Sequence, residues 1–166
     1  MDTMQSSPPP PAVLADVALV PAGAYATPLP RHLFALTSDA PFLDLLREVL
    51  EEGGYRVTAT PFAPAVFARI AAVQPALLIL DLAMRERAGW DLLERLHGEA
   101  ATRTIPVVVV STQRGYFSRA WDDRARFGSQ AVLEMPFDID DLLAVVRDAL
   151  LRAADSGARE GWCDRG

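Results

Sequence analysis

The stretch that decides the fold is ALLILDL, residues 76–82. An unbroken apolar run leads directly into a carboxylate, Asp81. Such a short, continuous run is typical of a β-strand that helices cover on both faces of a parallel sheet. In an open parallel sheet the loops and helix N-termini converge at the carboxyl ends of the strands, and the chemistry lies there. Asp81 therefore stands where a functional side chain is expected.

Four further short apolar runs flank this strand on either side, and amphipathic stretches alternate with them. The runs cover residues 33–36, 55–58, 106–110 and 131–133. This alternation predicts an α/β fold, a flavodoxin-like doubly wound five-stranded parallel sheet with helices on both faces. The run at 55–58 is more polar than the others, which predicts an edge strand.

Helices are expected between the strands, over residues 40–52, 64–73, 89–97 and 117–127, and again after residue 138. The first shows apolar residues at offsets of three, four, seven and eight, which predicts one buried face; they are Phe42, Leu45, Leu46, Val49 and Leu50. The last shows a similar apolar stripe of Ile139, Leu142, Leu143, Val146 and Leu150.

The chain divides into three parts by composition. Residues 1–30 include the run Pro8 to Pro11 and favour a disordered leader. Residues 31–153 form the expected domain, because a chain of 166 residues with 51% apolar content can bury one good core. Residues 154–166 are expected to be a flexible C-terminal tail, since the apolar period is lost from Ser156 onward.

Composition excludes several classes of function. The net charge of -6 argues against nucleic-acid binding. All 16 basic residues are arginines, so a P-loop lysine or a Schiff base is excluded. No apolar run approaches the length of a membrane span, and the single cysteine, Cys163, fits a reducing, cytoplasmic setting. His32 and His97 have no acidic cluster beside them and are expected at the surface.

Several motifs follow one another in order: ILDL at 79–82 with Met84 and Gly89 downstream, residues 106–112, and MPF at 135–137. Together they resemble the CheY-like receiver domain of response regulators, over residues 31–153. The resemblance implies a phosphoacceptor aspartate at the end of the third strand, which is Asp81. It also implies Mg²⁺ held by that aspartate, by an acidic pair after the first strand, and by a backbone carbonyl two residues beyond Asp81, here Ala83.

This chain departs from the family pattern at most of the remaining site positions. The acidic pair falls on Thr37 and Ser38, and the lysine that contacts the phosphoryl group falls on Met135. Ser111 matches the hydroxyl residue that senses the phosphoryl group, whereas the aromatic switch position falls on Val132. Hydroxyls are poor replacements for carboxylates around magnesium. Weak or no Mg²⁺-dependent phosphorylation is therefore expected.

Asp39 lies one residue too late to match the acidic pair. It can reach inward as a substitute carboxylate, but it precedes an amphipathic helix, so a role as helix cap is favoured. Without the pair, Asp81 has fewer repelling neighbours. A structural carboxylate hydrogen-bonded to Thr37, Ser38 or Ser111 is then physically reasonable.

The resemblance implies a stand-alone receiver-like module of a two-component or phosphorelay system, not an enzyme. Its expected partners are proteins: a histidine kinase or phosphotransfer protein and a downstream effector, with homodimerisation left open. The alternative is an adaptor or dimerisation module that works without phosphorylation. A remote alternative is a phosphatase with an aspartate nucleophile, but the second aspartate it needs two residues later is Ala83.

Overall fold

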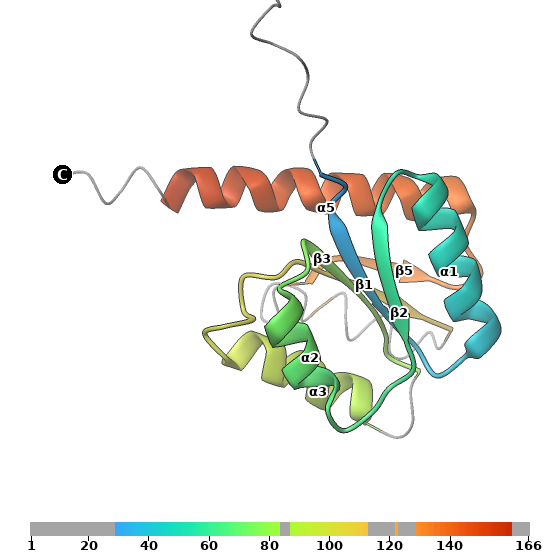
Figure 1. The fold of residues 1–166 in the computed structure, drawn as a ribbon, viewed down its shortest axis with the longest axis horizontal. Coiled ribbons are helices and arrows are strands. Elements are labelled where there is room, and N and C mark those ends of the chain that lie inside the picture. The colour runs from blue at the N-terminus through green and yellow to red at the C-terminus, as the bar shows by residue number, and fades with distance from the viewer. Residues whose placement is uncertain (1–28, 84–86, 113–121, 123–128, 161–166) are drawn as a thin grey trace, which may run out of the picture.

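The computed structural model describes residues 29–83, 87–112, 122 and 129–160. Its centre is a five-stranded parallel sheet in the order β2-β1-β3-β4-β5 (Figure 1). The strands are β1 (His32–Leu36), β2 (Arg56–Thr60), β3 (Leu77–Asp81), β4 (Val107–Ser111) and β5 (Ser129–Glu134). The predicted doubly wound α/β fold with five parallel strands is confirmed.

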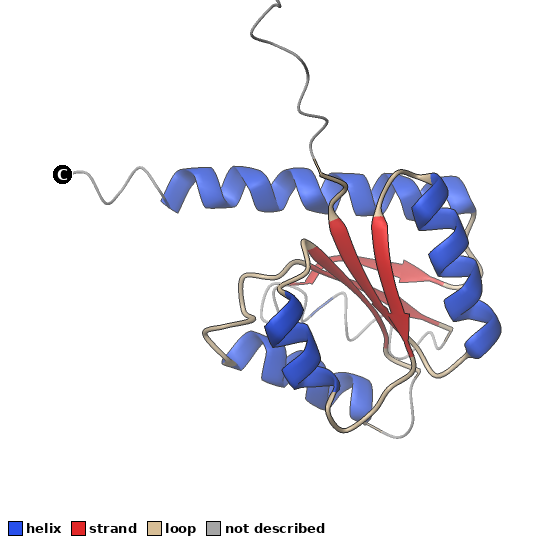
Figure 2. Ribbon diagram, in the orientation of Figure 1, coloured by secondary structure: helices blue, strands red, loops and turns tan. Residues whose placement is uncertain are grey.

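Helices cover both faces of the sheet (Figure 2). α1 (Ala40–Glu52) and α5 (Ile139–Glu160) pack on one face, and α2 (Val66–Val73) and α3 (Ala88–Gly98) pack on the other. The helix predicted over residues 117–127 lies outside the described residues, except for residue 122. Each described helix joins two parallel strands or follows the last one, as βα units require.

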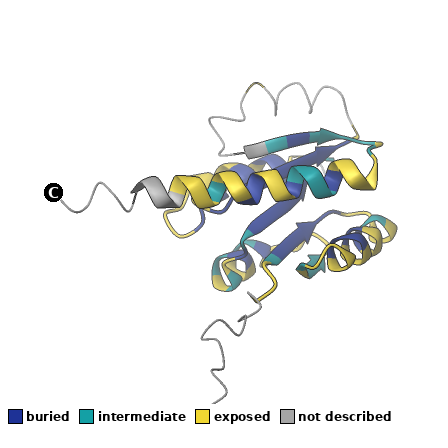
Figure 3. Ribbon diagram, turned by 90° about the horizontal axis from the view of Figure 1, so that it is seen from above, coloured by how far each residue is buried: buried dark blue, intermediate teal, exposed yellow. Residues whose placement is uncertain are grey.

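The strands bury alternate residues on opposite faces of the sheet. Phe34 and Leu36 of β1 join the core under α2 and α3, whereas Leu33 and Ala35 join the core under α1 and α5. Because both faces are covered, the central strands are apolar without interruption, and β3 is buried over its whole length. Figure 3 shows this buried centre with exposed residues along the outer side of α5.

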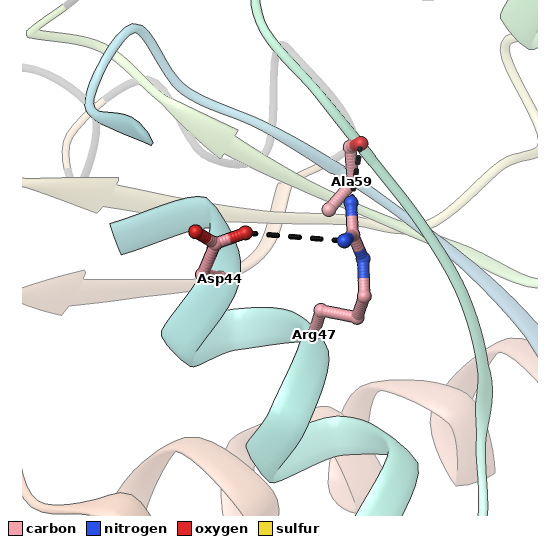
Figure 4. A network of polar contacts seen from close by, with 3 residues as sticks. All are labelled: Asp44, Arg47 and Ala59. Atoms are coloured by element: carbon pink, nitrogen blue, oxygen red, sulfur yellow. Dashed lines mark hydrogen bonds and ion pairs between the residues drawn. The ribbon is translucent and has the colours of Figure 1, made fainter. Parts of the chain in front are cut away.

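The edge position predicted for the second strand is confirmed, since β2 pairs with β1 alone and its residues are exposed or half-buried. The side chain of Arg47 in α1 contacts the backbone of this edge strand (Figure 4). Arg47 donates from Nη2 to the carbonyl of Ala59 at 3.3 Å, and its Nη1 lies 3.8 Å from Asp44 Oδ1. The side chains of Arg47 and Asp44 are 47% and 79% exposed, so the ion pair itself contributes little to stability.

Two residues expected in buried helical stripes are exposed, and those expectations were wrong. In α1 the buried residues include Leu43, while Leu45 is 45% exposed. In α5, Ile139 is 50% exposed because it is the first residue of the helix, and burial against the sheet starts at Leu142. The strip of each helix that meets the sheet is narrower than the full apolar face.

α5 is longer than the sequence predicted. It continues to Glu160, so residues 154–160 are helical and the boundary expected at residue 153 does not coincide with the end of the helix. The leader expected at residues 1–30 and the end of the tail, residues 161–166, fall almost wholly outside the described residues. In the described part of the chain, no helix combines the length and apolar content that crossing a bilayer requires.

Candidate functional site

The polar residues singled out from the sequence meet at one edge of the sheet. Asp81 closes β3 and Ser111 closes β4, while Thr37 directly follows β1 and Met135 directly follows β5. The register pairs Asp81 with Val110 and Ser111 with Glu134. Because all strands are parallel, these residues share the carboxyl edge, which is where the sequence placed the site.

Asp81 is 6% exposed, and within the part of the chain that the structure describes its carboxylate accepts hydrogen bonds from Thr37 and Ala83. Its Oδ2 accepts from the hydroxyl of Thr37 at 2.7 Å, which ties the end of β3 to the end of β1. Its Oδ1 accepts from the backbone amide of Ala83 at 2.8 Å, which shapes the turn after β3. Of the three hydroxyl partners considered for Asp81, the hydrogen bond to Thr37 is confirmed.

The residues after β1 form a short relay of hydrogen bonds. Thr37 is fully buried, and its hydroxyl oxygen accepts from the backbone amide of Asp39 at 3.1 Å while the hydroxyl donates to Asp81. Asp39 Oδ1 accepts from the amide of Phe42 at 3.0 Å, so the predicted helix cap is confirmed. Ser38 is exposed. The carboxylate of Asp39 therefore caps the N-terminus of α1.

The β4 and β5 side of the edge carries a hydroxyl and a thioether. Ser111 is fully buried, and its carbonyl accepts from the amide of Met135 at 2.9 Å. Met135 is half-buried and joins Pro136 through a cis peptide bond. Val132 is 8% exposed within the core under α2 and α3. A thioether and an isopropyl group thus stand where the family resemblance implies an ammonium and an aromatic ring.

Gly89 allows α3 to approach the end of β3 closely. A Cβ at this position would lie 3.0 Å from the carbonyl oxygen of Asp81 and 3.1 Å from the Cα of Leu82. Both neighbours are backbone atoms, which cannot rotate away as a flexible side chain can. The glycine that formed part of the family resemblance therefore has a packing reason in this structure. Met84, which also formed part of it, lies outside the described residues.

An open hollow of about 450 Å³ lies over these strand ends. Its lining combines the carboxylates of Asp39 and Asp81 with hydroxyls and apolar groups; the residues are Ser38, Asp39, Phe42, Asp81, Ala83, Thr112 and Met135. Among the described residues that line it, the charged side chains are both negative. Among the described residues, no three His, Cys, Asp or Glu side chains gather closely enough to hold a metal ion.

A second, mostly apolar hollow adjoins the first, and sequence reasoning did not find it. It is lined by Phe42, Leu45, Thr112, Met135, Pro136 and Phe137. The two hollows share Phe42, Thr112 and Met135. The signal was present in the sequence as MPF at 135–137, but Leu45 was assigned to the core. Only the packing of α1 beside the β5–α5 junction shows that Leu45 faces outward.

At the opposite end of the sheet, His32 bridges β1 and β2. Arg56 Nη2 lies 3.2 Å from Nδ1 of His32, and Nε2 lies 2.8 Å from the hydroxyl oxygen of Thr58. Because a guanidinium group only donates, Nδ1 must accept and Nε2–H donates to Thr58. Burial, followed by the charge of Arg56, lowers the pKa of His32 below 6.5. His32 is thus partly buried, whereas His97 is exposed as expected.

Comparison with curated proteins finds regulators that are much longer than the matched region. The DNA-binding transcriptional regulator NtrC of Rhizobium meliloti (strain 1021) is 30% identical over 112 residues, 68% of this chain and 22% of that protein. The DNA-binding dual master transcriptional regulator RpaA of Synechocystis sp. is 33% identical over 129 residues, 76% of this chain and 51% of that protein. The chain thus spans about a fifth of one relative and about half of the other.

Solved structures share the fold. A CheY-like receiver domain protein from Methanospirillum hungatei JF-1 superposes with a TM-score of 0.66 at 21% identity, covering 76% of this chain and 98% of that one. The receiver domain of a putative LuxO repressor protein from Vibrio parahaemolyticus gives 0.67 at 19% identity, covering 80% and 98%. The response regulator receiver domain family matches residues 38–147. This chain therefore belongs to the response regulator receiver domain family, the signalling modules of two-component systems.

Proposed function

We propose that this receiver signals through protein partners, with weak or no Mg²⁺-dependent phosphorylation at Asp81. The observation that carries the proposal is the surroundings of the Asp81 carboxylate. Its two oxygens accept from the Thr37 hydroxyl and the Ala83 amide, and the group is 6% exposed. A carboxylate held in this way fastens the loops after β1 and β3 together, which is a structural role.

The donors around Asp81 fit magnesium poorly. Mg²⁺ requires near-octahedral oxygen ligands, usually one or two carboxylates completed by waters and phosphate. Thr37 turns its hydroxyl proton toward Asp81 and accepts from the amide of Asp39, so its oxygen is already committed. Asp39 is committed to capping α1. A resident Mg²⁺ would have to break these hydrogen bonds to gain a single buried carboxylate.

Phosphoryl transfer to Asp81 also lacks a compensating positive charge in the described lining. Charge gathers on the phosphoryl oxygens during transfer, and enzymes offset it with metal ions, lysine or arginine. Met135 supplies a thioether on the side where the family resemblance implies lysine, and the charged residues of the hollow are Asp39 and Asp81. Two carboxylates repel a phosphoryl donor.

Receiver domains interact with kinases and effectors, and we propose protein partners of that kind for this chain. The expected partners are a kinase or phosphotransfer protein upstream and an effector downstream. In this proposal they recognise the surface of the receiver, and phosphorylation does not switch that recognition. The hydrogen bonds of Asp81 favour an adaptor or dimerisation role that does not need phosphorylation. A switch that retains weak phosphorylation is the alternative, favoured by the buried Ser111 at the end of β4.

The test is a titration of the ¹⁵N-labelled chain with Mg²⁺ and beryllofluoride, a phosphoryl mimic, followed by amide spectra. The wild-type spectrum is expected to stay unchanged at millimolar reagent, as should that of Asp81→Asn. The matched positive control is the triple variant Thr37→Asp, Ser38→Asp, Met135→Lys, which should respond because it regains two carboxylates and an ammonium. A saturable wild-type response that Asp81→Asn abolishes would refute phosphorylation-independent signalling.

A further inference from the structure

We propose that residues 13–17 of this chain add a sixth strand, antiparallel to β2 and on its outer edge, with Asp16 opposite Arg56. Two features carry the inference: an edge strand whose outward backbone groups are available for pairing, and an apolar segment of the same chain within reach of it. The inference goes beyond the proposed function, because it does not depend on whether Asp81 is phosphorylated.

The outer edge of β2 presents backbone groups that the sheet does not use. Among the described residues β2 pairs with β1 alone, and Figure 1 shows it at the border of the sheet. The amide of Arg56 donates to the carbonyl of Arg31 at 3.0 Å, on the inner side. Because backbone groups alternate in direction along a strand, those of Val57 and Ala59 point outward. Such an edge is a template for a further strand.

A side chain of α1 already uses one of these outward groups. The guanidinium of Arg47 donates to the carbonyl of Ala59 at 3.3 Å, and the side chain of Arg47 is 47% exposed (Figure 4). The contact shows that this carbonyl faces away from β1 and accepts a hydrogen bond. A backbone amide of a sixth strand would take over that hydrogen bond and release Arg47 to solvent.

The segment that fits this edge is AVLADVALV, residues 12–20, which lies outside the described residues. Pro11 and Pro21 bound it, and it contains neither proline nor glycine. Proline cannot donate to a strand ladder, so the two prolines limit a strand to the residues between them. The segment is also too short for a stable isolated helix. The disordered leader expected over residues 1–30 is thereby narrowed to the residues on either side of the segment.

The chain between this segment and β1 has a suitable length. The outer edge of β2 lies two strand spacings from β1, about 10 Å away. Residues 18–31 connect the new strand to His32 and span up to about 45 Å when extended. An antiparallel strand ends at the side of the sheet where β1 begins, so the connection crosses no strand. Tethering also gives an effective concentration of about millimolar, which favours this segment over a second copy.

The apolar side of the new strand would continue an existing core. Val57 and Ala59 are half-buried and pack against the core under α1 and α5. With Asp16 opposite Arg56, Ala15 stands opposite Val57 and Val13 stands opposite Ala59. Because side chains alternate between the faces of a sheet, these apolar residues fall on the covered face. The new strand would remove more of this apolar surface from water.

The other face of the new strand would pair opposite charges. Arg56 is exposed, and it takes part in none of the ion pairs between described residues. Asp16 is the only charged residue in the segment, and β2 has no carboxylate of its own. Opposite charges directly across an antiparallel pair stabilise it. A second copy of β2 would bring no carboxylate to Arg56, which again favours the chain's own segment.

Amide hydrogen exchange of the full chain tests the pairing, because docking protects the outward amides of Val57 and Ala59. Ala15→Pro removes an amide that points toward β2, so exchange at both positions should become about tenfold faster, as for a strand docked about nine-tenths of the time. Leu14→Pro is the matched control. Its amide points to solvent, where an edge strand tolerates proline, so the exchange rates should equal those of the wild type.

The charge pair has its own variants. Asp16→Arg opposes like charges and should speed exchange at the same two amides about threefold at low salt, with a smaller effect at high salt. Asp2→Arg makes the same charge change outside the segment and should have no effect. Nuclear Overhauser contacts between the Hα atoms of Leu14 and Thr58, and of Asp16 and Arg56, are expected for this register.

Four outcomes would overturn the proposal. Exchange at Val57 and Ala59 that is the same in wild type and Ala15→Pro excludes a sixth strand, and equal effects of Ala15→Pro and Leu14→Pro exclude the alternation that a strand requires. Overhauser contacts that place residues 12–20 in a helix or against another element also exclude it. Protection that rises with protein concentration and survives Ala15→Pro would assign the edge to a second copy.

Discussion

Replacing Thr37 with valine tests the structural role of the Asp81 carboxylate most directly. Valine has the shape of threonine, so Thr37→Val leaves no cavity but removes the hydroxyl that donates to Asp81 Oδ2 at 2.7 Å. A hydrogen bond to a charged group contributes about 1.5–3 kcal/mol. Because Asp81 is 6% exposed, water replaces the lost donor poorly. The amide of Asp39, which also loses its acceptor, belongs to an exposed residue and adds little.

The expected loss in the free energy of unfolding is therefore about 2–3 kcal/mol, or roughly 6–12 °C in Tm for a domain of this size. Urea denaturation at neutral pH measures it, with the slope against denaturant checked for constancy. Thr37→Ser keeps the hydroxyl and loses one methyl group, so it should cost only about 1 kcal/mol. These two variants separate the hydrogen bond from the packing.

A double-mutant cycle with Asp81→Asn isolates the pair. In the Asn background the hydrogen bond is between neutral groups, so Thr37→Val should cost about 1 kcal/mol. If Thr37→Val is no more destabilising than Thr37→Ser, or if its cost is the same in both backgrounds, the hydroxyl–carboxylate contact does not stabilise the fold. The structural role proposed for Asp81 would then be wrong.

Three further predictions follow from the packing. Gly89→Ala should lower the free energy of unfolding by about 1–3 kcal/mol in urea denaturation, because its Cβ meets the Asp81 carbonyl at 3.0 Å; a neutral effect would show that α3 shifts freely. Asp39→Ala should cost about 1 kcal/mol and Asp39→Asn almost nothing, since both Asp and Asn cap well; equal losses would contradict the capping role. Because folding lowers the pKa of His32 below 6.5, protonation of this ring favours the unfolded chain. The contribution of His32 to the free energy of unfolding is therefore fully present above pH 6.5 and is lost as the pH falls below it. The urea midpoint measured against pH checks this: the decline just below pH 6.5 should be smaller in His32→Gln, and an unchanged decline would contradict the role of His32.

Much of the fold was predictable from local pattern. The apolar run before Asp81 and the alternation of strands and helices identified a parallel sheet, because a strand buried on both faces can carry hardly any polar residues. The bounds of α1 were predicted correctly, because Asp39 and Gly53 mark its ends. The end of α5 was not predicted, since the apolar period is lost from Ser156 onward and the chain is nevertheless helical to Glu160.

The positions of the candidate site were predictable for a similar reason. Parallel strands present their carboxyl ends at one edge, so residues that follow different strands meet there whatever their separation along the chain. Thr37, Asp81, Ser111 and Met135 were placed together on this basis, and the structure brings them to that edge. Which hydroxyl would bond to Asp81 was left open among three residues, because the answer depends on side-chain direction.

By itself, the sequence determined that five strands follow one another along the chain, that Asp81 lies at the end of one of them, and which residue types surround it. These features follow from periodicity and from the order of residues along the chain. Only the tertiary structure decided that Thr37 donates to Asp81, that Gly89 lies against the end of β3, and that Leu45 faces a hollow instead of the core. Helical periodicity assigns a residue to one side of a helix. What covers that side depends on how neighbouring elements pack, and α1 beside the β5–α5 junction left Leu45 exposed.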